Sequence, residues 1–402
     1  MKPLAEPDAQ EESVTPPPDP TRTALVLSFS DFANDPRPHR QLRWLSKRFR
    51  VVALGTGAPN LPDIEFKRIT LTPKKGVWAK LKSATMLYAG LHEAFYWNHD
   101  YHQDALRQLE GIRPDLVVAN DLSSLPLATR VARGAKVVFD AHEYSPREWE
   151  DSLFWRLTYQ RNVVGLCRQF LPRADAMLTV CQGIADEFQR TFQVSPRVIT
   201  NAPPYHDLAP RPTDPARIRL ITHGAAIRAR RIENMIAMMA HLDERFELDL
   251  MLVPNDPAYV QELRELAARQ PRVRFVDPVP MTEIVPRTAE YDMGVFLLEP
   301  TNFNYAMALP NKFFEFLQAR LAIAIGPSPE MARIVTGEGC GVVAPDFRPE
   351  TLARALNTLT AERIDGFKQQ AHRLAARYSA EENERVFMGL VSRLLGEELV
   401  RT

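Results

Sequence analysis

Short apolar runs alternate with helix-like stretches along most of the chain. Nearly continuous runs of this kind are typical of parallel strands that helices cover on both faces. In the first half we expect strands at 23–29, 50–55, 115–121, 136–142, 176–181 and 197–203. In the second half we expect them at 218–224, 246–254, 273–277, 293–300, 322–326 and 341–345. The alternation predicts βαβ units and therefore an α/β fold with doubly wound parallel sheets.

The stretch NAPPYHDLAPRPTDPAR, residues 201–217, interrupts this alternation. Its proline and small polar residues are typical of a linker, and a chain of 402 residues is too long for one ordinary core. We therefore predict two Rossmann-like domains that face a cleft, at 22–200 and 218–379, with 201–217 as the hinge. A C-terminal helix within 380–402 follows them, and it can pack back on the first domain or stay with the second.

Composition and charge narrow the possible functions. Lys plus Arg and Asp plus Glu number 50 each, and the zero net charge argues against a general nucleic-acid binder. Cys167, Cys181 and Cys340 have neither metal-site nor disulfide spacing, as expected in a reducing cytoplasm. Residues 1–21 are acidic and proline-rich without the apolar core of a signal peptide, which predicts a disordered leader. No apolar run reaches the length of a membrane span. We expect a cytoplasmic protein that can bind peripherally at the inner face of the membrane.

The stretch ALPNKFFEFLQARLAIAIG, residues 308–326, places polar residues at the start of an otherwise apolar helix. Pro310 suits the first turn, and the free amides there, with the positive end of the helix dipole, favour an anion. Lys312 would add a positive charge, and Glu315, three residues later on the same face, suits the hydroxyl groups of a sugar. The alternative is a Lys–Glu surface pair that caps a core helix.

A second cluster, THGAAIRARRIENM, spans residues 222–235. A predicted strand ends at Gly224, and Arg228, Arg230 and Arg231 follow it. Guanidinium groups bind phosphate in a forked geometry, so three of them beside a helix start suit a diphosphate. The alternative is a solvated basic turn.

Polar residues also follow two strands of the first half. His142 and Glu143 follow the strand in FDAHEYSPREWE, residues 139–150, and Asn120 and Asp121 end another strand. Ligands of open α/β sheets bind outside the carboxyl ends of the strands, so these side chains are expected to line the cleft. A histidine there can take a proton, orient a substrate or donate to a sugar hydroxyl. The alternative is a structural histidine.

Residues 74–101 combine four lysines with several large apolar side chains. A basic amphipathic stretch of this kind can lie on an anionic membrane surface, and the alternative is a core-packed helix with a solvated start. A second aromatic cluster, Trp149, Phe154, Trp155 and Tyr159, either rims the cleft or belongs to the core.

Several well-known enzyme motifs are missing from the sequence. It has no G-x-G-x-x-G after a strand, no P-loop, no H-E-x-x-H and no G-x-S-x-G. We therefore expect chemistry that needs neither a nicotinamide nor a protein nucleophile, and we see no metal-binding cluster.

Together, the three clusters resemble the retaining glycosyltransferases of the GT-B fold, in the family 4-like group (glycosyltransferase group 1), over most of residues 23–380. The segment LPNKFFEFLQARLAIAIGPSPEM (309–331) is similar to the group's LPNK-hydrophobic-FE-hydrophobic signature and the Pro-Glu loop after it. RADAMLTVCQGIADEF (173–188) resembles the segment that closes the first domain in this group, and HGAAIRARRIENMI (223–236) resembles its donor-phosphate loop.

The resemblance implies that a nucleoside diphosphate sugar binds in the cleft. Arg231 would hold the diphosphate, Lys312 would face it from the helix start, and His142 would contact the sugar near the reacting carbon. These three are the expected catalytic residues. The other residues with implied donor contacts are Gly224, Arg228, Asp277, Val279, Asn311 and Glu315.

Within that second set, Glu315 would bind the ribose, Asn311 would face the phosphates, and the turn Asp277–Val279 would contact the base.

The chain departs from the group's pattern in three places. Many relatives carry a second glutamate where this chain has Met307, and an arginine where it has Ala225. The first loop, 28–41, lacks the glycines that often approach the donor. These departures leave open an inactive relative that only binds the donor.

The function that the resemblance implies is transfer of a sugar to a glycan or lipid-linked acceptor, with retention. We expect neither a metal nor a cofactor besides the donor. The acceptor would bind on the first domain beside Asn120, Asp121 and Glu143, with contact to the inner face of the membrane through 74–101, in polysaccharide or cell-envelope assembly. The alternatives are a non-catalytic nucleotide-sugar-binding scaffold and a sugar-nucleotide epimerase of the same fold.

Overall fold

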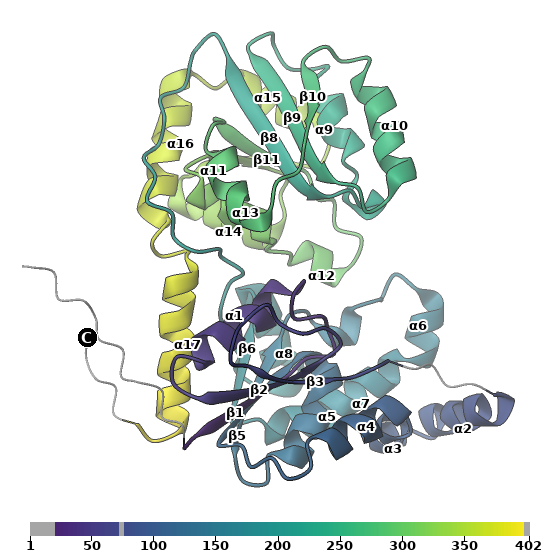
Figure 1. The fold of residues 1–402 in the computed structure, drawn as a ribbon. Helices are drawn as coiled ribbons and strands as arrows, with labels where there is room; N and C mark the ends of the chain where they lie inside the picture. The colour runs from purple at the N-terminus through teal and green to yellow at the C-terminus, as the bar shows by residue number, and fades with distance from the viewer. Residues whose placement is uncertain (1–20, 72–75, 398–402) are drawn as a thin grey trace, which may run out of the picture.

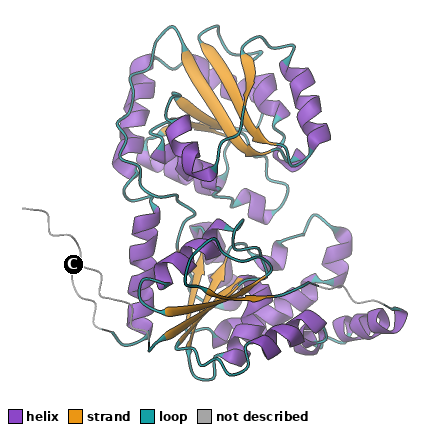
Figure 2. Ribbon diagram, in the orientation of Figure 1, coloured by secondary structure: helices purple, strands orange, loops and turns teal. Residues whose placement is uncertain are grey.

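The computed structural model describes residues 21–71 and 76–397, and Figure 1 shows two α/β domains, one above the other. The first has a sheet with strand order β3-β2-β1-β4-β5-β6-β7, and the second has a sheet with order β10-β9-β8-β11-β12-β13. All neighbouring strands in both sheets run parallel. Figure 2 shows helices on both faces of each sheet. The predicted fold class is therefore confirmed.

Each predicted apolar run contains a strand, although the strands expected at 197–203 and 293–300 end several residues before the predicted bounds. Those of the first sheet are β1 (Thr23–Leu27), β2 (Arg50–Gly55), β3 (Glu65–Arg68), β4 (Leu116–Asn120), β5 (Lys136–Ala141), β6 (Ala176–Thr179) and β7 (Arg197–Val198). Those of the second are β8 (Ile218–Ala225), β9 (Phe246–Val253), β10 (Val273–Val276), β11 (Met293–Phe296), β12 (Ala322–Ile325) and β13 (Gly341–Val343). The sequence pattern missed β3, because this edge strand reads EFKR and is only partly buried.

The helices fill the intervals between the strands. Those of the first domain are α1 (Pro36–Leu45), α2 (Val77–Tyr88), α3 (His92–Trp97), α4 (Asp100–Gln108), α5 (Asp121–Val131), α6 (Leu153–Thr158), α7 (Gln160–Phe170) and α8 (Gln182–Phe192). Those that follow β8 are α9 (Glu233–Met238), α10 (Pro257–Ala267), α11 (Ile284–Thr288), α12 (Phe303–Ala306), α13 (Asn311–Gln318), α14 (Pro329–Glu338), α15 (Pro349–Asn357), α16 (Ala361–Leu374) and α17 (Ala380–Leu394).

The last helix, α17, returns from the second domain and packs against α1 of the first (Figure 1). Phe387 of α17 is fully buried, and its ring lies 5.5 Å from that of Trp44. An ion pair of 2.5 Å between Lys47 and Glu384 fixes the outer edge of this contact. The chain therefore crosses between the domains twice, once before β8 and once before α17.

The first crossing, which includes the predicted hinge, is held against the second domain. Buried Arg320 donates to the backbone oxygens of His206 and Leu208, at 2.5 and 3.1 Å. The His206 amide donates to Gln318 Oε1 at 3.1 Å. These bonds fix the middle of the linker to the end of α13 and the residues just after it.

The basic amphipathic stretch noted at 74–101 contains α2, α3 and the start of α4. Gly90, with a φ of 70°, marks the first break. None of the residues of α2, each described by the structure, is buried, so the core-packed interpretation is wrong for this helix. Lys74 and Lys75 lie outside the described residues. So do residues 1–20 of the leader predicted at 1–21. In the described ranges, no helix combines the length and apolar character needed to cross a membrane.

Candidate active site between the domains

A cavity of about 360 Å³ lies between the two domains. Side chains of both domains line it. From the first domain these are His142, Glu143, Glu148, Trp149, Val180, Ile184 and Asn201. From the second domain they are Arg230, Phe296, Leu298, Asn302, Asn304, Tyr305 and the run Met307–Pro310. Concave sites of this size at a domain interface are where small ligands bind.

The start of α13 borders this cavity. Pro310 precedes the helix with extended backbone (ψ 156°) and makes no side-chain cap. The Phe313 amide donates to the Pro310 carbonyl at 3.0 Å, so the amides of Asn311 and Lys312 are the ones available to a ligand. Lys312 and Glu315 follow, and only 8% and 7% of them is exposed. The alternative of a solvated surface pair is therefore wrong for these two residues.

Burial dominates the electrostatics of this pair. Burial, together with the charge of nearby Arg230, lowers the pKa of Lys312 to about 7, and Glu315 opposes the shift. Burial raises the pKa of Glu315 to about 7, although Lys312 and Arg40 act against it. The Lys312 Nζ atom lies 4.1 Å from the centre of the Phe296 ring. A lysine held in this way gains its proton most readily when an anion arrives.

Gly224 is the second-last residue of β8 and lies beside Lys312 and Arg230. Its φ of 113° favours glycine, and an added Cβ would lie 3.6 Å from Lys312 Nζ and 3.7 Å from Arg230 Nη1. Arg230 Nη1 donates to the carbonyl of Ala225 at 3.2 Å. Of these three residues, Arg230 lines the cavity, and Gly224 and Lys312 lie beside it outside the cavity lining.

The other two arginines of this turn point elsewhere in the structure. Arg228 makes ion pairs with Asp256, at 3.0 Å, and Glu262, at 2.7 Å, on the side of α10. Arg231, with a φ of 46°, pairs with Glu299, and both side chains are exposed. Such an exposed pair is weak, so a diphosphate can compete for Arg231. The roles that we predicted for Arg228 and Arg231 stay predictions, whereas the arginine that lines the cavity is Arg230.

The first-domain wall is built around His142, just after β5. Its Nε2 atom lies 3.0 Å from Asn120 Oδ1, and its Nδ1 atom lies 3.2 Å from Asp121 Oδ2. The His142 amide also donates to Asp121 Oδ1, at 3.1 Å. Because both ring nitrogens face oxygen acceptors, the second contact requires a proton on Nδ1 or on the Asp121 carboxyl group. The structure brings these three predicted residues together.

Asp121 is the first residue of α5 and has a φ of 59°. A left-handed aspartate at a strand-to-helix turn costs on the order of 1 kcal/mol, and such residues gather at functional sites. Burial raises its pKa, and the charge of His142 opposes that shift. The turn aims the Asp121 carboxyl group at His142.

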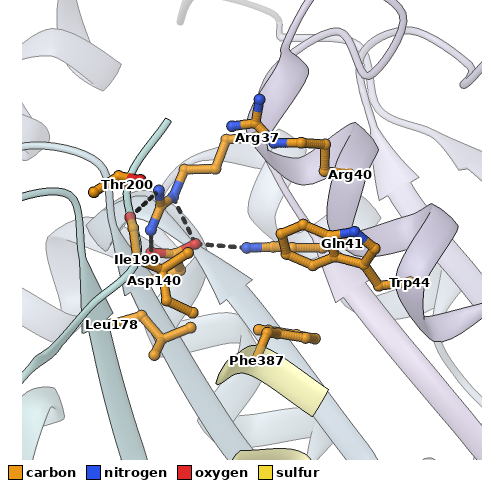
Figure 3. A pocket seen from close by; sticks show the side chains of 9 residues that line it. All are labelled: Arg37, Arg40, Gln41, Trp44, Asp140, Leu178, Ile199, Thr200 and Phe387. Atoms are coloured by element: carbon orange, nitrogen blue, oxygen red, sulfur yellow. Dashed lines mark hydrogen bonds and ion pairs between the residues drawn. The ribbon is translucent and has the colours of Figure 1, made fainter. Parts of the chain in front are cut away.

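A buried polar network lies behind this wall, and the sequence analysis missed it. Asp140 accepts two bonds from Arg37, at 2.8 and 2.7 Å, and one from Gln41, at 2.5 Å (Figure 3). Asn120 in turn donates to Gln41 Oε1 at 2.9 Å. Burial alone would raise the pKa of Asp140, but Arg37 outweighs it and the pKa is lowered. The network fixes the amide of Asn120 so that its oxygen faces His142.

Two further carboxyl groups give this wall an acidic character. Glu143, predicted for the site, and Glu148, which was not, both line the cavity. Burial, with the charges of Glu148 and Asp121, raises the pKa of Glu143 to about 7. Burial likewise raises the pKa of Glu148. Beside them, 57% of Trp149 is exposed, so the core interpretation is wrong for this side chain.

The remaining predicted residues lie at or beyond the edge of the cavity. Asn311 is the first residue of α13 and is half-buried. Asp277 and Val279 follow β10 at the edge of the second sheet and lie outside the cavity lining. Asp277 is exposed, whereas Val279 packs on the core. Their implied contact with a base stays a prediction.

Close contacts join the two domains beside the cavity. Glu330 of α14 accepts from the amides of Gly183 and Gln182, at 2.9 and 3.3 Å, and so caps α8 of the other domain. Met307 lies in the same contact, where its carbonyl accepts from Cys181 Sγ at 3.3 Å. The position where relatives were expected to carry a second glutamate thus belongs to the interface between the domains.

A second contact is made by α12. The amide of Tyr144 donates to Asn304 Oδ1 at 2.9 Å, and the amide of Phe303 donates to Glu150 Oε1 at 2.6 Å. Arg147 lies over the Phe303 ring, 4.6 Å from its centre.

Between residues 21 and 397, apart from 72–75, no group of three or more His, Cys, Asp or Glu side chains is placed to hold a metal ion.

Comparisons with known proteins agree with this architecture. Residues 39–209 match the family model Glycosyltransferase Family 4. No curated protein matches the chain in sequence. HepE of Anabaena, solved with UDP and glucose, is similar at 15% identity and a TM-score of 0.65, over 92% of this chain and 99% of HepE.

Two other solved structures have the same fold. Sucrose-phosphate synthase of Thermosynechococcus elongatus aligns at 15% identity and a TM-score of 0.65, over 93% of this chain and 99% of that one. WaaG, a glycosyltransferase involved in lipopolysaccharide biosynthesis, aligns at 14% identity and a TM-score of 0.56, over 91% and 100% of the two chains.

Proposed function

We propose that this chain is a GT-B glycosyltransferase, because residues 39–209 match the Glycosyltransferase Family 4 model and most of the chain shares the fold of WaaG, a glycosyltransferase. It transfers a sugar from a nucleoside diphosphate sugar to a glycan or lipid-linked acceptor. The observation that carries this proposal is the pair of opposed walls in the cavity between the domains. Arg230 gives one wall a positive charge, with Lys312 beside it just outside the lining, and Glu143 and Glu148 make the other wall acidic.

In this proposal the cationic wall binds the donor. The diphosphate lies against the free amides of α13, with Lys312 and Arg230 beside it and Gly224 allowing its close approach. Glu315 accepts hydrogen bonds from the ribose hydroxyls, and the base extends toward the turn after β10. Arg230 takes the place of the arginine that relatives carry at position 225, since its guanidinium reaches the Ala225 carbonyl.

The acidic wall then orients the acceptor and the donor sugar. His142, held by Asn120 and Asp121, contacts the sugar near its anomeric carbon. The bond from that carbon to the diphosphate breaks, and a bond from the acceptor oxygen forms on the retained face. The acceptor proton passes to the departing diphosphate or to a cavity carboxylate. Fixed cations stabilise the charge that develops on the leaving group, and this is where most of the rate acceleration arises.

We propose that the reaction needs no metal, since Lys312, Arg230 and Arg231 can neutralise the diphosphate. Turnover is then expected to survive EDTA unchanged. The measurement is release of nucleoside diphosphate before and after chelation. A loss of activity that Mg²⁺ or Mn²⁺ restores would exclude the metal-free mechanism.

A panel of UDP-, GDP-, ADP- and TDP-sugars tests the proposed function directly. One nucleotide class is expected to raise the melting temperature, because it binds only the folded protein. The same donor should release its diphosphate slowly even without an acceptor. Glu315→Ala is expected to abolish the stabilisation, and Glu265→Ala, an exposed residue of α10, is the matched control.

One rival function is favoured by a specific observation. Met307 lies in the domain interface at the position where relatives were expected to carry a glutamate, which suits a protein that binds the donor without turnover. Stabilisation by a nucleotide sugar, without diphosphate release in the presence of any acceptor, would establish that rival.

We also propose that the reaction takes place at the cytoplasmic face of the cell envelope. The similarity to WaaG, which is involved in lipopolysaccharide biosynthesis, supports this location.

A further inference from the structure

The first domain carries a large apolar surface that the donor site does not use. A groove of about 680 Å³ runs between α2 and the α6–α7 segment. Most of its lining is apolar or aromatic: Leu71, Leu87, Phe95, Tyr101, Phe154 and Tyr159. Among polar groups, Lys80 and His99 also reach it. Its volume exceeds that of the cavity between the domains.

The two helices beside the groove expose further apolar side chains on their outer faces. On α2, 83% of Trp78 is exposed, and Leu81 and Tyr88 follow at helical spacing. On α6, 68% of Phe154 and 70% of Leu157 are exposed. Figure 1 shows that α2 stands away from the rest of the domain, with α6 on the same side of the molecule. Contiguous apolar patches of this kind mark interaction surfaces.

The charges carried by α2 and by the segment 153–161 are of one sign, although Asp100, Glu150 and Asp151 lie close to them in the sequence. Residues 77–91 and 153–161 contain Lys80, Lys82 and Arg156, together with Arg161, and no Asp or Glu, although the whole chain has zero net charge. A second copy of this chain would face the same cations across a twofold contact and would be repelled. A partner that is both apolar and anionic fits, and an anionic lipid surface has both properties.

The groove and the cavity between the domains share one short segment. Trp149 lines the cavity, whereas Phe154 lines the groove. Five residues of chain span at most about 18 Å. A single acceptor molecule can therefore place its polar end in the cavity and its hydrocarbon part in the groove.

We propose that α2 and α6 form one lipid-docking surface, which seats the protein on an anionic bilayer. The groove between them receives the hydrocarbon part of the acceptor. Trp78, Leu81, Phe154 and Leu157 enter the interfacial region, and the lysines and arginines meet lipid phosphates. This inference rests on the proposed function and names its acceptor class, an anionic lipid-linked molecule.

Vesicle flotation with the full-length protein tests the docking surface. Vesicles of phosphatidylcholine with phosphatidylglycerol should carry the wild type upward in a density gradient, and phosphatidylcholine alone should carry much less. Trp78→Ser combined with Leu157→Ser is expected to lower partitioning about tenfold or more. Leu266→Ser, an exposed leucine of α10, is the matched control and should float like the wild type.

Nucleotide-induced thermal stabilisation, measured on the same preparations, separates the two proposals. Stabilisation that is equal in the wild type and the double variant, with flotation lost only in the variant, supports the docking surface. Equal flotation of both proteins, or no flotation of either, overturns it while leaving the proposed function intact. A wild-type dimer that the double variant converts to a monomer also overturns it. No nucleotide response in any protein overturns the proposed function, and with it the acceptor class.

Discussion

Lys312→Met is expected to lower kcat about a hundredfold or more, because it removes a fixed cation where charge develops on the leaving diphosphate. The methionine keeps most of the apolar stem of the buried lysine, so the variant should fold. Lys136→Met, an exposed lysine paired with Asp175, is the control and should be unchanged. Steady-state kinetics with the identified donor make the comparison, and an unchanged kcat would remove Lys312 from the mechanism.

The protonation of Lys312 gives the same prediction a second readout. Burial lowers its pKa to about 7 in the free protein, so its amine is increasingly neutral above that pH. A bound diphosphate favours the ammonium form, and binding at pH 8 must then take up protons. Affinity therefore falls as the pH rises from about 7 toward 10.5, the ordinary value for lysine.

Calorimetry at pH 8 in two buffers with different ionisation enthalpies measures this uptake. Glu315→Gln serves as the background, because burial raises the pKa of Glu315 to about 7 and its titration would overlap. Uptake should persist in Glu315→Gln and disappear when Lys312→Met is added. Equal proton uptake in Glu315→Gln and in the double variant with Lys312→Met would assign the proton to another group.

Arg230→Gln is expected to lower kcat/KM about a hundredfold, since Arg230 is the arginine of its turn that lines the cavity. Arg228→Gln is the matched control, because the same substitution two residues away removes a guanidinium that Asp256 and Glu262 hold on the surface. Its effect should stay within about threefold.

Arg231→Gln belongs in the same series. The pair between Arg231 and Glu299 must open before this guanidinium can reach a diphosphate, and the variant tests the role that the resemblance implies. Equal losses at 228 and 230 would mean that the turn rearranges when the donor binds.

The order of arginines along this turn explains why sequence reasoning could not choose among them. Three guanidinium groups lie within four residues, and a short 3₁₀ turn followed by left-handed Arg231 sends them in different directions. Acidic partners from other elements hold two of them, Arg228 through Asp256 and Glu262, and Arg231 through Glu299. Spacing along one segment carries no information about those partners.

The start of α13 is the opposite case. Pro310, Lys312 and Glu315 are local to one helix, so their placement on a shared face follows from helical geometry. His142 was found for a similar reason, because the end of a buried strand at a known edge of the sheet fixes its position. The network of Arg37, Gln41 and Asp140 was missed, since it joins a helix and a strand that lie about a hundred residues apart.

The packing of α17 on α1 has a consequence for how the protein is made. The core of the first domain includes Phe387 and Val391, so that domain remains incomplete until these residues have been translated. At roughly 5–20 residues per second, the interval after residue 200 lasts on the order of 10–40 s. During that time Trp44 and its neighbours lack their last partner. A fragment that ends at the linker would keep this defect permanently, so the first domain is a unit of structure but not a unit of biosynthesis.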